Sequence, residues 1–235
     1  MTNHRQTAGD GRAAVVAGLR ERLGGAFSPA ALREEKRFRL GLPGIDGVCG
    51  GLPAGALTEV VVPPASAGSG LILEALLELA RRESAYLALV DGGDSFDPET
   101  MGVEGLEQLF WVRCSRPEQA VEATDLLLRD SNFRFHAVNL SHHEPARMKK
   151  MPGHVWYRFQ RLAGQTGAVV VLFSSAASIP SARLRLSCPA AGGIERLDWP
   201  RRRLAAELRV NILRDHRRGV PGEGGKDDLL GLAAS

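Results

Sequence analysis

The sequence predicts an α/β fold in which helices cover both faces of a mostly parallel β-sheet. Short runs of mostly apolar residues alternate with segments of helical periodicity, as in strands buried on both faces of a sheet. The last such runs follow one another closely, which predicts antiparallel strands at the C-terminal edge of the sheet. A chain of 235 residues is long enough to bury one core of this kind.

Each predicted element follows from the period of its apolar residues. Central strands are expected over residues 56–62, 86–91, 109–114, 135–140 and 168–173, and edge strands over 183–187, 194–199 and 204–213. Helices are expected over residues 71–82, 115–129 and 152–165. In the second helix, Ser115 as N-cap and Glu118 three residues later have the spacing of a capping box.

The two ends of the chain differ in composition from this central part. Short helices are expected over residues 13–23 and 29–38, the second capped by Ser28. Residues 40–55 are dense in glycine and proline and are expected to form loops. The predicted organisation is an N-terminal helical extension over 1–39, a core over 40–218 and a flexible tail over 219–235.

Charge is distributed unevenly along the chain. Residues 147–218 contain 15 Lys/Arg against 4 Asp/Glu, whereas residues 1–146 contain 14 against 20. An acidic first part joined to a basic second part predicts a polyanion or an acidic partner for the second part. A solvated basic face is the alternative interpretation.

The cysteines and the apolar runs indicate a cytoplasmic protein. Cys49, Cys114 and Cys188 are few, odd in number and widely separated, which predicts neither a disulfide framework nor a metal site. No apolar run reaches the roughly 18 residues of a membrane helix. The first residues lack the apolar stretch of a secretory signal.

Three collinear blocks resemble the RecA superfamily. Gly44-Ile45-Asp46 followed by the run from Gly50 to Glu59 resembles the segment that enters the strand before the phosphate loop of that family. Residues 91–98 resemble its "D-A-E-H-A-L-D-P" segment, and residues 116–127 resemble its "G-E-Q-A-L-E" helix. The resemblance implies a RecA-like sheet and, in the family, an ATP site with Mg²⁺.

The residues that would hold and hydrolyse ATP depart from the family pattern. The stretch equivalent to the phosphate loop is Pro63, Pro64, Ala65, Ser66, Ala67, Gly68, Ser69 and Gly70. It contains no lysine, and its two prolines lack the backbone N–H groups that wrap phosphates. Gly93 occupies the position of the acid that activates water, and Ser141 occupies that of the acid that positions magnesium. We therefore expect a pseudo-ATPase that uses no ATP, Mg²⁺ or other cofactor.

Basic residues in three places are the candidates for contacts with DNA or a protein partner. They are Arg147, Lys149 and Lys150 at the position of the first DNA loop of the family, Arg201, Arg202 and Arg203 beside Trp199, and Arg214, Arg217 and Arg218 in the last strand and its basic ending. The second DNA loop corresponds to residues 176–182, which are too few to thread a DNA strand. The loop from His142 to Glu144 is interpreted as solvated and not as a metal site.

Short RecA-like chains with eroded nucleotide motifs resemble the ImuA family of accessory factors. This resemblance implies a non-catalytic adaptor in the bacterial DNA damage (SOS) response that supports mutagenic translesion synthesis. The partners it implies are a Y-family-type polymerase subunit or RecA; direct DNA contact and self-association stay open, and no membrane is involved. The alternatives are a weak nucleotide-binding RecA paralogue that uses Asp94 and Ser69, and a cell-division inhibitor of the SulA type.

Overall fold

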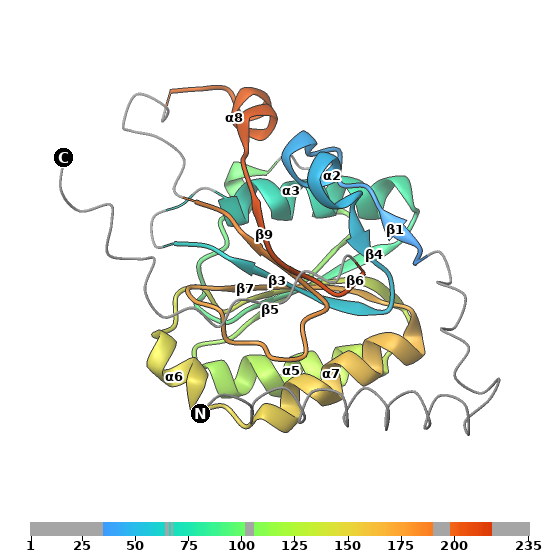
Figure 1. The fold of residues 1–235 in the computed structure, drawn as a ribbon, viewed down its shortest axis with the longest axis vertical. Helices are drawn as coiled ribbons and strands as arrows, with labels where there is room; N and C mark the ends of the chain where they lie inside the picture. Colours follow the sequence, from blue (N-terminus) through green and yellow to red (C-terminus); the bar gives the residue numbers. More distant parts are fainter. Residues whose placement is uncertain (1–34, 64–65, 67, 102–105, 190–197, 218–235) are drawn as a thin grey trace, which may run out of the picture. The chain divides into compact units, whose positions relative to one another are not determined.

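A computed structural model describes the chain over residues 35–63, 66, 68–101, 106–189 and 198–217. Seven of the strands in this part form one sheet in the order β5-β4-β6-β7-β3-β8-β9 (Figure 1). Their bounds are β3 (Ala56–Val61), β4 (Tyr86–Asp91), β5 (Leu109–Arg113), β6 (Phe133–Asn139), β7 (Val169–Ser174), β8 (Leu184–Ser187) and β9 (Asn211–Asp215). Neighbouring strands are parallel except β8 and β9, so the predicted mostly parallel sheet with an antiparallel C-terminal edge is confirmed.

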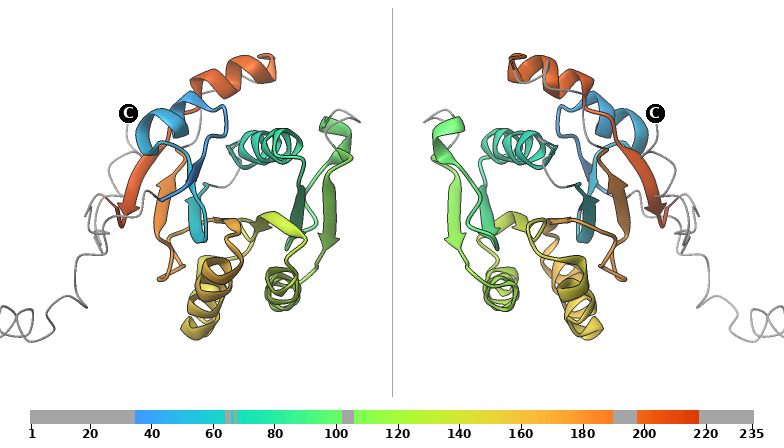
Figure 2. Two further views of the ribbon diagram at one scale, coloured as in Figure 1. Left: turned by 90° about the vertical axis from the view of Figure 1, so that its right-hand side faces the viewer. Right: turned by 90° about the vertical axis from the view of Figure 1, so that its left-hand side faces the viewer.

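Helices cover both faces of this sheet, as Figure 2 shows from the side. On one face lie α2 (Pro43–Cys49), α3 (Gly68–Arg82) and α8 (Arg201–Glu207); on the other lie α5 (Pro117–Arg129), α6 (Pro145–Lys149) and α7 (Gly153–Thr166). A single 3-10 turn, Pro98–Thr100, follows β4. None of these helices is long and apolar enough to cross a bilayer.

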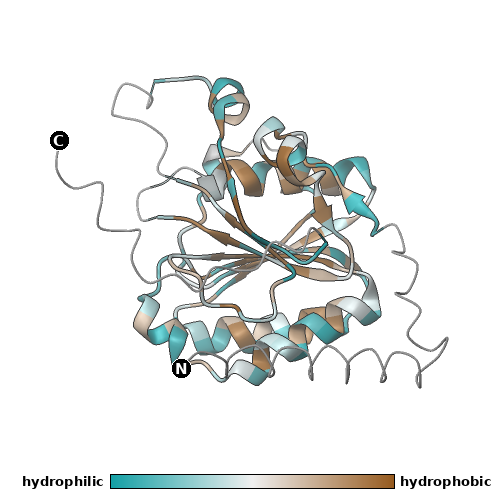
Figure 3. Ribbon diagram, in the orientation of Figure 1, coloured by the Kyte–Doolittle hydropathy of each residue, from teal (hydrophilic) through white to brown (hydrophobic). Residues whose placement is uncertain are grey.

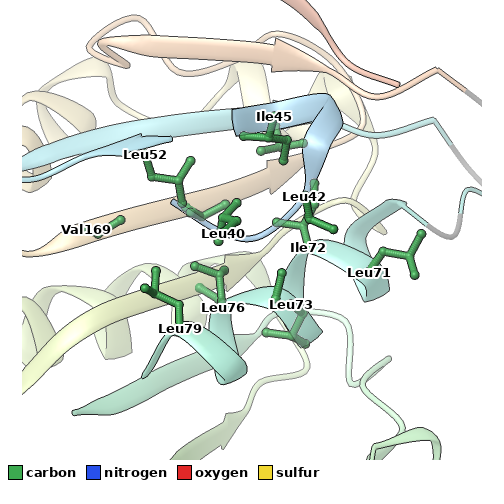
Figure 4. Close-up of a cluster of buried hydrophobic side chains, with 14 of the residues drawn as sticks. Leu40, Leu42, Ile45, Leu52, Leu71, Ile72, Leu73, Leu76, Leu79 and Val169 are labelled. Atoms are coloured by element: carbon green, nitrogen blue, oxygen red, sulfur yellow. The ribbon is translucent and has the colours of Figure 1, made fainter. Parts of the chain in front are cut away.

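The core is divided by the sheet into two clusters of buried side chains. The strands are apolar along most of their length, and the helices turn their apolar sides toward them (Figure 3). In the cluster above one face, Ile72 and Leu76 of α3 pack with Leu40, Leu42 and Ile45 (Figure 4). Because β7 and β3 lie at the centre of the sheet, every residue of β7 is buried.

The N-terminal side of the core contains elements that the sequence did not predict. Residues 43–49 form α2 instead of a loop, because Pro43 suits the first turn of a helix and Gly50 ends it in the left-handed conformation at φ +75°. The helix expected over 29–38 is wrong at its end, since β1 (Arg37–Phe38) pairs antiparallel with β2 (Leu52–Pro53). The expected helix over 13–23 lies outside the described residues.

The C-terminal side also differs from the prediction. Residues 201–207 form α8, whereas a strand was expected from residue 204 to 213; only β9 is a strand in that range. The strand expected over 194–199 lies mostly outside the described residues. The predicted strand over 183–187 is β8, which is parallel to β3 and antiparallel only to β9.

The capping box predicted at the start of α5 is not formed. The helix begins at Pro117, and its N-cap, Arg116, makes no capping bond through its side chain. The Ser115 hydroxyl instead donates to the side chain of Gln119 at 3.1 Å. The carboxylate of Glu118 contacts Arg147, so this prediction is wrong.

Candidate functional site

A pocket of about 340 Å³ opens at the carboxyl ends of β3, β6 and β7. Open α/β sheets bind their ligands in a crevice at this position. The pocket is lined by Val62, Pro63, Ser66, Ser69, Ser141, His142, His143, Glu144, Pro145 and Ser175. Of the predicted phosphate-loop residues, Pro64, Ala65 and Ala67 lie outside the described part of the chain. The described lining residues therefore supply hydroxyl, imidazole and carboxylate groups but no lysine or arginine.

Two side chains from outside α3, those of Ser66 and Cys188, contact its first turn. The hydroxyl of Ser66 accepts the backbone N–H of Gly68 at 3.2 Å. In the phosphate-loop motif the lysine directly precedes the Ser/Thr. If Ser69 is aligned with that Ser/Thr, Gly68 stands at the position of the lysine. A Cβ atom at Gly68 would lie only 2.4 Å from Sγ of Cys188. The thiol of Cys188 thus fills the place where the side chain of that lysine would begin.

Cys188 lies directly after β8 and is buried. Burial raises the pKa of its thiol, and a hydrogen bond with Ser66 opposes that effect in part. The thiol is therefore protonated at neutral pH and brings no charge to the first turn of α3.

Asp91, at the carboxyl end of β4, accepts hydrogen bonds from the backbone of the following turn. Both the N–H of Ser95 and that of Phe96 donate to Oδ2 of Asp91 at 2.7 Å, and the Ser95 hydroxyl donates to Oδ1 at 3.2 Å. Asp91 itself is fully buried. Its carboxylate therefore holds the turn after β4 in place, as a capping side chain does.

The two glycines that follow Asp91 make room for the loop after β6. A Cβ at Gly93 would lie 3.0 Å from Cβ of His142, and a Cβ at Gly92 would lie 2.7 Å from the carbonyl oxygen of Asn139. The ring of His143 lies over Gly92, and its burial lowers the pKa of this histidine. An acidic side chain at position 93 would have to displace His142.

Asp94 is the remaining acid near this position, and it points to the edge of the sheet. Its two carboxylate oxygens accept hydrogen bonds from Nε and Nη2 of Arg113 on β5, at 2.6 and 2.7 Å. The hydrogen bond with this guanidinium lowers the pKa of Asp94. The carboxylate is held by Arg113, which leaves it poorly placed to orient a water in the pocket.

Ser141 belongs to a hydrogen-bond network between β4 and β6 that ends at the carboxylate of Asp91. Its hydroxyl donates to Oδ1 of Asn139 at 2.7 Å, and Nδ2 of Asn139 donates to the hydroxyl of Ser95 at 2.9 Å. Where the family has a carboxylate for magnesium, this chain has an amide and two hydroxyls. Neutral oxygens of this kind are weak ligands for Mg²⁺ compared with carboxylates.

The connection from β7 to β8 is fixed by a buried carboxylate on β3. Glu59 is fully buried; its Oε1 accepts the Ser174 hydroxyl at 2.9 Å and the N–H groups of Ser178 and Ile179 at 2.7 and 3.3 Å. Its Oε2 accepts Nε of Arg185 on β8 at 2.5 Å. This connection, which the resemblance equates with the second DNA loop, is thus a short pinned turn.

The basic residues predicted at the first DNA loop lie on α6 and just after it. Arg147 pairs with Glu118 of α5 at 3.0 Å. Lys149 and Lys150 are exposed, and the described residues give neither of them a carboxylate partner. Two free cations at this position can attract an anion but do not form an enclosed site.

The arginine triplet lies on α8, on the other face of the sheet. Arg201 pairs with Glu74 of α3 at 2.7 Å, and the guanidinium of Arg203 stacks at 3.7 Å from the centre of the Trp199 ring. Arg202 is exposed. A Cβ at Gly70 would lie 3.9 Å from Nη2 of Arg201, so this arginine approaches the first turn of α3 from outside.

The third basic group is at the antiparallel edge. Nη1 of Arg214 on β9 donates to the carbonyl of Pro180 at 2.8 Å, and Arg217 is exposed just after β9. Arg218 lies outside the described residues. The predicted basic residues thus occupy three separate places, and the structure does not bring them together in one patch.

Several contributors to the pocket were missed by sequence reasoning. His142 and Ser175 line it, and Cys188 contacts Gly68 beside it, from segments that are distant in the sequence, and no local pattern marks such contacts. The loop from His142 to Glu144, interpreted as solvated, lines the pocket wall. Glu59 was noticed only as part of a family motif, although its place in an otherwise apolar strand was a signal of a buried ion pair.

Comparison with known proteins gives partial matches to RecA. The chain is 36% identical to Protein RecA of Pseudomonas putida over 84 residues, which is 35% of this chain and 23% of that protein. It is 33% identical to Protein RecA of Ruegeria pomeroyi over 122 residues, 51% of this chain and 33% of that protein. No family model matches the chain. The chain spans only a quarter to a third of the curated relatives it matches, and these matches support a RecA-like relationship.

Proposed function

We propose that this chain is a non-catalytic, RecA-like accessory protein of the bacterial DNA damage response. Its role is to support mutagenic translesion synthesis through contacts with RecA or a Y-family-type polymerase subunit. The observation that carries the proposal is the refilled nucleotide site. The side chains of Ser66 and Cys188 contact Gly68 in the first turn of α3, and the side chain of His142 lies beside Gly93.

The size of the lost interactions supports the loss of nucleotide binding. A hydrogen bond to a charged group contributes about 1.5–3 kcal/mol. The lack of both a lysine and a metal-binding acid removes two such contacts. Because about 1.4 kcal/mol corresponds to a factor of ten, affinity for Mg-ATP falls by roughly two to four powers of ten. Hydrolysis loses the water-orienting acid in addition. A weak nucleotide switch through Asp94 is disfavoured by the two-point contact of that residue with Arg113.

Calorimetric titration with Mg-ATP tests the non-catalytic part of the proposal. We expect no saturation below millimolar nucleotide and no phosphate release above the rate of a buffer blank. A bacterial RecA handled in the same way is the positive control. Sub-millimolar affinity, or turnover that follows the protein through a second purification, would overturn this part.

Affinity purification from cells exposed to a DNA-damaging agent tests the accessory role. We expect RecA or a Y-family-type polymerase subunit to co-purify with the tagged chain, and unexposed cells are the control. A chain that elutes alone under both conditions contradicts the role. Direct DNA contact is tested by binding single-stranded DNA across a salt series, where charge reversal of Arg202 and Arg203 reduces the salt slope if they meet phosphates.

A further inference from the structure

A second hollow lies between α3, residues 40–42 and α8. Its volume is about 280 Å³, the size of one or two large side chains. Its floor is apolar and is made by Leu40, Leu42, Leu71, Ala75 and Ala205. Figure 4 shows residues 40 and 42 beside α3. We call this hollow the α3–α8 groove.

The rim of the α3–α8 groove carries two arginines that form no ion pair in the described ranges, although the charge of Arg82 helps to lower the pKa of Glu78. Arg82 donates to the backbone carbonyl of Arg39 at 2.8 Å, and Arg202 is exposed. The two acids of the rim are already matched. Glu74 pairs with Arg201 at 2.7 Å, and Glu78 pairs with Arg81 at 2.8 Å.

Both walls of the groove are held in place before any partner arrives. The ion pair between Glu74 and Arg201 joins α3 to the start of α8. At the other end of α8, the backbone carbonyl of Leu208 lies so close to α2 that a Cβ at Gly44 would be 1.9 Å from its oxygen. A preformed groove loses little entropy when it is filled, which favours binding.

We propose that the α3–α8 groove binds an acidic peptide segment of a partner protein that carries a leucine or phenylalanine between its acids. The apolar side chain fills the floor, and carboxylates on either side meet Arg82 and Arg202. Arginine clusters recognise acidic motifs in this way, and a buried apolar anchor supplies most of the affinity in such contacts. This inference rests on the proposed accessory role and assigns it a surface.

The same features disfavour DNA as the occupant. A phosphodiester chain is recognised by cations in a row along its path, and it has no apolar side chain for the floor. The lining of this groove offers no such row, because Glu74 and Glu78 stand among its arginines. A peptide can place its acids at the two arginines alone.

Fluorescence anisotropy with the full chain tests the proposal. The probe is a fluorescein-labelled peptide with the sequence Gly-Ser-Asp-Asp-Leu-Phe-Glu-Asp-Gly. One matched peptide has serine in place of leucine and phenylalanine, and another has asparagine and glutamine in place of the acids. We expect saturable binding of the first peptide and at least tenfold weaker binding of both matched peptides. Equal binding of all three peptides, or of none, refutes the proposal.

Variants place the binding in the groove. We expect Arg202→Glu to weaken binding about tenfold and Ala205→Trp, which fills the floor without changing charge, to abolish it. Arg161→Glu, at an exposed position of α7, is the matched charge reversal on the other face and leaves affinity unchanged. Far-UV circular dichroism confirms that each variant is folded. If Ala205→Trp binds as the unmodified chain does, the groove is not the site.

A single-stranded oligonucleotide in the same assay distinguishes the other occupant. Binding of the oligonucleotide that is lost in Arg202→Glu, together with no peptide binding, overturns the proposal in favour of a DNA contact. The accessory role is judged separately, by co-purification. If groove variants still co-purify with RecA or a polymerase subunit, the adaptor proposal stands and the groove assignment fails.

Discussion

Replacing Glu59 with glutamine is expected to destabilise the fold more than any exposed charge change. The variant keeps the shape of the side chain and its acceptor for the N–H groups of Ser178 and Ile179. It removes the negative charge that Arg185 contacts, and only a small part of that arginine side chain reaches solvent. The guanidinium is then left without its counter-charge in a largely buried place.

The magnitude follows from the burial of the pair. The Glu59 side chain is fully buried and that of Arg185 is 11% exposed. Removing one partner of a buried ion pair costs about 3–5 kcal/mol. For a domain of this size the melting temperature falls by about 2–4 °C per kcal/mol, which gives a decrease on the order of 10 °C. Arg185→Met is expected to cost a similar amount, because Glu59 is then the unpaired group.

Urea unfolding followed by circular dichroism measures both variants and the double variant Glu59→Gln/Arg185→Met. We expect the double variant to lose at least about 2 kcal/mol less than the sum of the single variants, because neither buried charge is then left alone. Glu78→Gln, which removes an exposed pair with Arg81, is the control and is expected to cost under about 0.5 kcal/mol. Additive single effects, or a Glu59→Gln variant within about 1 kcal/mol of the unmodified chain, would refute the reasoning.

Three further predictions concern tight contacts and one buried histidine. Gly68→Ala is expected to cost about 1–3 kcal/mol in urea unfolding because its Cβ meets the Cys188 thiol, and Cys188→Ala is expected to relieve most of that cost. Gly44→Ala must displace the carbonyl of Leu208; a thermal melt like that of the unmodified chain would contradict this contact. Burial lowers the pKa of His136 to about 4, whereas its value in the unfolded chain is about 6.5. The unfolded chain therefore binds the proton first, and stability that is fully present above pH 6.5 falls by roughly 2 kcal/mol by pH 5. His136→Gln should remove that part of the decrease, and an unchanged pH slope would show that another group is responsible.

The sheet could be predicted because its strands are buried on both faces. Such strands need apolar residues at every position, and runs such as residues 169–173 stand out without any knowledge of their neighbours. Two of the elements that were missed, α2 and α8, are short helices attached to the outside of the core. α2 is marked only by Pro43 and Gly50 at its ends, and the two helices meet where the carbonyl of Leu208 approaches Gly44; no periodicity reveals either feature.

For the candidate site, the sequence could show only which residues of the family motif are absent. The missing lysine and the glycine at position 93 are visible in the sequence because the family motif fixes what should stand there. What stands there instead could not be predicted. Cys188 reaches Gly68 from the end of β8, and His142 reaches Gly93 from the end of β6, so both contacts depend on the strand order of the folded sheet.

Each of these two glycines is in close contact with one other side chain, Gly68 with Cys188 and Gly93 with His142. A lysine restored at Gly68 would begin 2.4 Å from the Cys188 thiol, and an acid restored at Gly93 would begin 3.0 Å from His142. Neither charge can return unless a second residue also moves. The buried sheet packs through apolar side chains on both of its faces, and few of them line the crevice. Changes in the polar residues of the crevice therefore need not disturb the packing of the sheet.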